Sequence, residues 1–108
     1  MIRHISLFRL MKEPANGRTM EENGKALVEF LRTLPEKNPA IISCQAGLSL
    51  GGPDSPPDAP VMFTHVAQVI DFADMEGAMA YPASEAHTAL VEFSAGIVEK
   101  VVAMDYEI

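Results

Sequence analysis

The sequence predicts an α+β domain of the ferredoxin-like type, with the order βαββαβ, an antiparallel sheet and helices on one face. Apolar side chains alternate with period two over residues 2–11 and 63–72, which is typical of strands, and two shorter strands are expected over residues 41–46 and 98–106. Helical patterns separate the first segment from the second and the third from the fourth, as in a split βαβ fold. We expect the first and third strands to be parallel neighbours at the centre of this sheet.

The first half of the chain predicts one strand, one helix and a second strand. Residues 2–11 are apolar on both sides in the middle of the segment. Thr19 and Glu22 have the spacing of a capping box, so we expect a helix to begin there. Apolar residues continue at helical spacing to Leu34, and Pro35 ends the helix because the residue before a proline avoids helical backbone angles.

The second half begins with a loop and continues with a broken helix. Residues 51–60 contain four prolines and two glycines, which predicts a surface loop between strands and not a domain boundary. A short helix is expected over residues 74–81. A further helix is expected from its cap, Ser84, to about Ser94, with Gly96 near its end.

Composition predicts a single domain over residues 1–108. A chain of this length, 48% hydrophobic, can bury about two-thirds of its unfolded surface. The net charge of −7, with only 8 Lys and Arg, argues against nucleic-acid binding, which needs clustered cations. The single Cys44 excludes an intrachain disulfide and fits a reducing compartment. No run approaches the roughly 18 apolar residues of a membrane span, so we expect a soluble, cytoplasmic protein without membrane contact.

The predicted helices can cover only one face of the predicted sheet. The central strands are apolar on both sides, and a soluble monomer does not leave a large contiguous apolar face in water. We therefore predict a two-fold homodimer in which two sheets pack together and enclose a barrel-like space. The alternative is a monomer whose faces are less apolar in three dimensions than in the sequence.

The histidines are the clearest chemical signal. His4 and His65 lie near the starts of the two central strands, so parallel strands in register would place both rings on one inner face, about 5 Å apart. Such rings need a partner, a water or a ligand, and a hydrogen-bonded core pair is the alternative. A metal site formed with His87 has enough ligands but lacks any supporting local spacing. Ser6 and Ser43 lack a plausible catalytic triad.

Four segments resemble the stress-responsive A/B barrel (Dabb) family. Residues 1–10 resemble its first strand, and residues 63–72 its third. Residues 81–87 and 102–106 resemble its last helix and strand. The resemblance implies a dimeric α/β barrel, in a family whose members mostly have no assigned reaction.

A plant branch of that family contains cofactor-free polyketide cyclases with a tyrosine and a histidine six residues apart. The resemblance implies that Tyr81 orients a substrate carbonyl and that His87 is the general base. Imidazole suits this role because it takes and returns protons near neutrality. No cofactor or metal is implied, and the chain has no tryptophan of the kind that haem oxidation in related barrels usually needs. A small apolar or aromatic ligand, held in a cavity of the dimeric barrel, would contact His4, His65, Phe8 and Phe63.

Two other interpretations stay open. From the residues alone, Tyr81 could end a helix with its hydroxyl at the surface, and His87 could be an ordinary polar residue of a first helical turn. The protein could also be a non-enzymatic, stress-associated structural homo-oligomer. The chain differs from the family pattern by having Ser84 and Glu85 where a His-Pro step is common, with the proline at Pro82.

Overall fold

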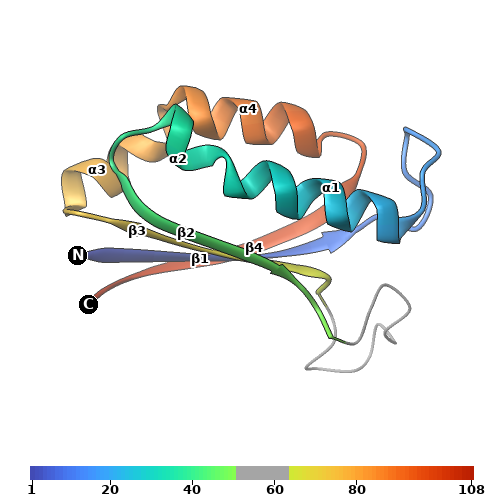
Figure 1. Ribbon diagram of the computed structural model, residues 1–108, viewed down its shortest axis with the longest axis horizontal. Coiled ribbons are helices and arrows are strands. Elements are labelled where there is room, and N and C mark those ends of the chain that lie inside the picture. Colours follow the sequence, from blue (N-terminus) through green and yellow to red (C-terminus); the bar gives the residue numbers. More distant parts are fainter. Residues whose placement is uncertain (51–63) are drawn as a thin grey trace.

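The computed structural model describes residues 1–50 and 64–108 and contains a four-stranded antiparallel sheet with helices on one face (Figure 1). The strand order is β2-β3-β1-β4, which confirms the predicted ferredoxin-like α+β fold. The elements are β1 (Ile2–Leu10), α1 (Met20–Arg32), α2 (Leu34–Lys37), β2 (Ile41–Leu48), β3 (Val66–Phe72), α3 (Met75–Ala80), the 3-10 turn η1 (Tyr81–Ala83), α4 (Glu85–Ser94) and β4 (Val98–Glu107). The predicted loop over residues 51–60 and Phe63 lie outside the described residues.

Helix α1 begins as predicted and ends slightly earlier. The Glu22 amide donates to Thr19 Oγ1 at 3.1 Å, and the Thr19 amide donates to Glu22 Oε1 at 3.0 Å, completing the capping box. Pro35 lies in the first turn of the separate helix α2, where a missing amide hydrogen costs no helical hydrogen bond. No helix within residues 1–50 and 64–108 is long and apolar enough to cross a membrane.

The central strands β1 and β3 are neighbours, but the predicted parallel direction is wrong. They pair antiparallel, with His4 opposite Ile70 and Phe8 opposite Val66. The crossover through α1 returns the chain to the end at which it started, so β2 runs in the same direction as β1. Strand β3 pairs antiparallel with β2 and therefore runs opposite to β1 as well.

The core lies between the sheet and the helices. Leu27 and Leu31 of α1 are completely buried, as are Leu34 and Ile70. Side chains of β1 alternate between this core and the opposite face, so that Phe8 is buried and Leu7 is 36% exposed. The alternation predicted from the sequence therefore places every second side chain of β1 against the helices and the others on the opposite face of the sheet.

The other side of the sheet is an apolar surface, which we call the open face. The helices α1–α4 of the described residues lie on the opposite side of the sheet (Figure 1). Strand register places the members of the open face together: Ile5, Leu7, Ala67, Val69, Val102, Met104 and Tyr106. Val102 and Met104 are 44% and 61% exposed. The predicted uncovered apolar face is therefore present in a single protomer.

One end of the open face carries an ion pair. Arg3 donates from Nε to Asp71 Oδ1 at 2.8 Å and from Nη2 to Oδ2 at 2.9 Å. The Ser43 hydroxyl donates to the same carboxylate at 3.1 Å. These hydrogen bonds, the Arg3 pair above all, lower the pKa of Asp71. The polar side chains at this end of the face are thus paired with one another.

Candidate functional site

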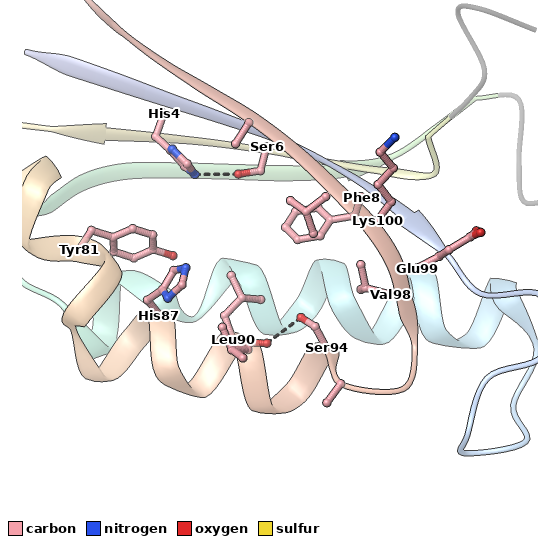
Figure 2. Close-up of a pocket in the computed structure, with 14 residues that line it drawn as sticks. His4, Ser6, Phe8, Tyr81, His87, Leu90, Ser94, Val98, Glu99 and Lys100 are labelled. Atoms are coloured by element: carbon pink, nitrogen blue, oxygen red, sulfur yellow. Dashed lines mark hydrogen bonds between the residues drawn. The ribbon is translucent and has the colours of Figure 1, made fainter.

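A cavity of about 440 Å³ lies between α4 and the helix-facing side of β1 and β4 (Figure 2). Its polar end is formed by His4, Ser6, Tyr81 and His87. Its remaining walls are largely apolar and include Phe8, Leu90, Val91, Val98, Val101 and Ala103. A pocket with apolar walls and a few convergent polar groups is typical of small-molecule sites.

Tyr81 and His87 are brought together by a tight turn between α3 and α4. The Ser84 hydroxyl donates to the Tyr81 carbonyl at 2.6 Å and accepts from the His87 amide at 3.3 Å. Ser84 is therefore the N-cap of α4. The ring of His87 meets that of Tyr81 edge-on, with centroids 5.2 Å apart.

The Tyr81 hydroxyl is a buried donor without a partner among the described residues. Tyr81 is only 4% exposed, so the alternative of a surface hydroxyl is wrong. Burial, with a smaller effect of the Cys44 thiol, raises the pKa of Tyr81 to about 12. The hydroxyl therefore stays protonated near neutrality. Because an unsatisfied buried donor is costly, an acceptor at this position would be bound favourably.

His4 is held between a carboxylate and a hydroxyl. Its Nδ1 lies 2.5 Å from Asp105 Oδ1, and its Nε2 lies 2.7 Å from Ser6 Oγ. When the carboxylate is ionised and the ring is neutral, Nδ1 carries the hydrogen and donates to Asp105, and Nε2 accepts from the Ser6 hydroxyl. The His4 ring is 5.9 Å from that of Tyr81. The expectation that Ser6 has no triad partners is therefore wrong.

Asp105, which contacts the cavity residue His4 without lining the cavity itself, was missed by the sequence analysis. It lies directly opposite His4 in the β1–β4 ladder, although 101 positions separate them in the chain. The sequence does indicate that His4 and Ser6 lie on the same side of one strand, because they are two residues apart. Identifying Asp105 also required the register of β4, which periodicity alone does not fix.

His65 lies at the opposite end of the sheet from His4. Its amide donates to the Phe8 carbonyl at 2.8 Å, and its Nδ1 accepts from the Leu10 amide at 2.9 Å. The predicted pairing of His4 and His65 is wrong because antiparallel strands place their starts at opposite ends. His4 also faces the helices, not the open face. Within residues 1–50 and 64–108, no three metal-ligating side chains form a cluster that could hold an ion.

Acidification is expected to destabilise the fold through His65. Burial, followed by the positive charge of Arg9, lowers the pKa of this 4% exposed residue. Between the folded value and the unfolded value of 6.5, the unfolded chain binds more protons, so stability falls as the pH falls. Urea denaturation at a series of pH values should show a weaker acid dependence for His65→Gln, since glutamine keeps an acceptor but does not titrate. Equal pH dependence in both proteins would contradict this role.

Several solved structures share this fold. A dimeric protein of unknown function from Bacteroides fragilis has 22% identity and a TM-score of 0.74, with 99% of this chain and 95% of that chain covered. A Dabb family protein from Mesorhizobium loti has 18% identity and a TM-score of 0.71, with coverages of 99% and 95%. A hydroxynitrile lyase from Passiflora edulis has 18% identity and a TM-score of 0.73, with coverages of 99% and 92%. No curated protein sequence matches the chain.

The structural similarities establish the ferredoxin-like architecture, and a sequence profile identifies the family. The profile of the Stress responsive A/B Barrel Domain matches residues 2–108. That match extends from the first residue of β1 to the end of the chain and includes every element around the cavity. The chain therefore belongs to the stress-responsive A/B barrel (Dabb) family.

Proposed function

We propose that the protein is a homodimer whose protomers each bind a small apolar or aromatic molecule in the cavity and catalyse cofactor-free proton transfer on it. The observation that carries this proposal is the Tyr81 hydroxyl, a buried donor without a described partner. It belongs to a ring in contact with the rings of His4 and His87. A ligand carbonyl placed there would satisfy the hydroxyl and lie beside an imidazole.

The proposed chemistry follows from these two side chains. Tyr81 donates a hydrogen bond to the carbonyl oxygen, and His87 removes a proton from the neighbouring carbon. The enolate oxygen that develops is stabilised by the same hydroxyl. Return of the proton to another position gives isomerisation, and attack of the enolate carbon on a second carbonyl gives cyclisation.

The cavity walls define the class of ligand. Figure 2 shows Tyr81 and His87 at one end and the aromatic ring of Phe8 farther along the cavity. Leu90 of α4 and Val98 of β4 provide further apolar surface. An aryl or alkyl ketone matches this arrangement, because its carbonyl can meet the polar end while its apolar part contacts the hydrophobic walls.

The proposed dimer buries the open face of each protomer against that of its partner. The exposed apolar side chains of β1 and β4 support it, as does the description of a similar Bacteroides fragilis protein as dimeric. The cavity lies on the helix side of the sheet, so each protomer contains its own polar groups. The free thiol of Cys44 supports a cytoplasmic location, where disulfides are rare.

Phenylacetone tests the function, since it combines an aromatic ring with exchangeable C–H bonds beside a carbonyl. Binding should raise the melting temperature of the protein, and NMR in D₂O should detect deuterium incorporation faster than in buffer. A thermal shift without catalysed exchange would overturn the proton-transfer part of the proposal. Absence of both effects, including with phenolic ligands, would favour the structural homo-oligomer.

Tyr81→Phe is expected to lower activity without lowering stability. Removing an unsatisfied buried hydroxyl should leave the free energy of unfolding unchanged or raise it by up to about 1–3 kcal/mol. The exchange rate should fall by roughly 10²–10³-fold, as when an oxyanion donor is removed. Urea denaturation and the NMR assay measure the two effects on one sample. A clear loss of stability would mean that the hydroxyl has a structural partner.

A further inference from the structure

We propose that Ser6 is a nucleophile that hydrolyses small apolar carboxylic esters, activated by His4 and Asp105. This activity uses the same cavity as the proposed proton transfer but needs neither the same base nor the same substrate. It would make the cavity a site of acyl transfer, a reaction class that differs from enolate chemistry.

The first argument is the order of the hydrogen bonds. Asp105 Oδ1, both ring nitrogens of His4 and Ser6 Oγ form a continuous chain with steps of 2.5 and 2.7 Å. The carboxylate fixes the tautomer in which Nε2 is free to accept the hydroxyl proton. Carboxylate, imidazole and hydroxyl in this order form the arrangement that activates serine in hydrolases of unrelated folds.

The second argument is the position of Ser6 relative to the cavity. Ser6 is 3% exposed, yet it lines the cavity together with His4 and Phe8. Figure 2 shows the His4–Ser6 hydrogen bond along the sheet side of the cavity, with Tyr81 and α4 across from it. An ester in this space would lie in the cavity that the Ser6 hydroxyl and the His4 imidazole both line.

The third argument is a donor for the developing negative charge. Attack on an ester carbonyl produces an oxyanion, which needs a hydrogen bond within the site. The buried Tyr81 hydroxyl has no described partner, and its ring contacts that of His4. The group that donates to a ketone in the proposed proton transfer is therefore available to an ester oxyanion.

Another serine of the same cavity lacks these features. The Ser94 hydroxyl donates its hydrogen to the Leu90 carbonyl of α4 at 2.6 Å, so this hydrogen is not shared with an imidazole. Ser43, on the opposite face of the sheet, donates to Asp71 with no imidazole between them. These two residues are internal comparisons for the reactivity of Ser6.

The ester and water are the only reactants that this hydrolysis needs. Ser6 Oγ forms a bond to the carbonyl carbon while its proton moves to His4 Nε2. The carbon–oxygen bond to the alcohol then breaks, and the alcohol leaves with that proton. Water attacks the acyl-enzyme, gives one proton to His4, and releases the carboxylic acid as the proton returns to Ser6 Oγ.

A fluorophosphonate with a short alkyl chain tests the nucleophile directly. Serine attack forms an oxygen–phosphorus bond, fluoride leaves, and the product is stable enough for peptide mapping by mass spectrometry. We expect one adduct on the wild-type protein, located on Ser6, with Ser94 and Tyr81 unmodified. No adduct, or an adduct only on another residue, would overturn the proposal even if Ser6 variants fail to fold.

Variants and a chromogenic ester extend the test. Hydrolysis of p-nitrophenyl butyrate should be lost in Ser6→Ala and fall at least about 10-fold in Asp105→Asn, whose amide no longer fixes the His4 tautomer. Ser43→Ala should retain labelling and hydrolysis. Hydrolysis that persists in folded Ser6→Ala would overturn the assignment. Phenylacetone exchange without serine labelling would overturn this inference alone, and labelling without exchange would overturn only the proposed proton transfer.

Discussion

Replacing His87 by alanine is expected to lower the rate of deuterium exchange into phenylacetone by roughly 10²–10⁴-fold, the usual contribution of a general base. His87 projects from the first turn of α4, and its ring lies edge-on to that of Tyr81, 5.2 Å between centroids. Its removal takes away the proposed proton acceptor and leaves the Ser84 cap intact, because Ser84 binds the backbone amide of residue 87. Proton NMR in D₂O measures the rate.

The neighbouring Thr88 provides a matched control for this substitution. Thr88 is exposed on the same helix and does not line the cavity, so Thr88→Ala should exchange at the wild-type rate. Circular dichroism and the melting temperature establish that both variants are folded. An unchanged rate in folded His87→Ala would remove His87 from the mechanism and leave His4 as the remaining imidazole of the cavity.

Substituting glutamate for Val102 is expected to convert the proposed dimer into monomers. Val102 lies opposite Leu7 in the β1–β4 ladder, and both side chains belong to the open face. A two-fold interface would bury two copies of the new carboxylate in apolar surroundings, at a cost of several kcal/mol for each. Sedimentation should change from twice the protomer mass to the protomer mass of 11.7 kDa.

Met79→Glu is the control for the added charge. Met79 is 74% exposed and lies in α3, on the helix side of the sheet, so this variant should sediment like the wild type. A wild-type protein that sediments as a monomer at micromolar concentration would contradict the dimer. Dissociation of both variants would show that net charge, and not the open face, governs assembly.

The fold could be predicted from the sequence because its strongest signals are local. Period-two alternation identified β1 and β3, and the Thr19–Glu22 capping box located the start of α1. The direction of β3 relative to β1 was mispredicted, because direction depends on the path of the whole chain and periodicity carries no information about it. Because of this error, His65 was wrongly predicted to lie beside His4.

The candidate site was predictable only in part, for a related reason. The Tyr81–His87 pair was suggested by family resemblance at a fixed separation, and the turn closed by Ser84 holds both in one cavity. The hydrogen bond between His4 and Asp105 depends on the register between β1 and β4, which come from opposite ends of the chain. Burial of the Tyr81 hydroxyl without a partner depends on packing from several elements, which no short pattern in the sequence encodes.

Edge strand β4 supplies two surfaces from alternate residues. Val101, Ala103 and Asp105 point toward the helices, whereas Val102 and Met104 belong to the open face. A slip of this strand by one residue along β1 would exchange the two sets. It would place a carboxylate on the open face and leave His4 opposite an apolar side chain. The proposed dimer and the proposed chemistry therefore both depend on the register of β4, and we expect an insertion within this strand to disrupt both.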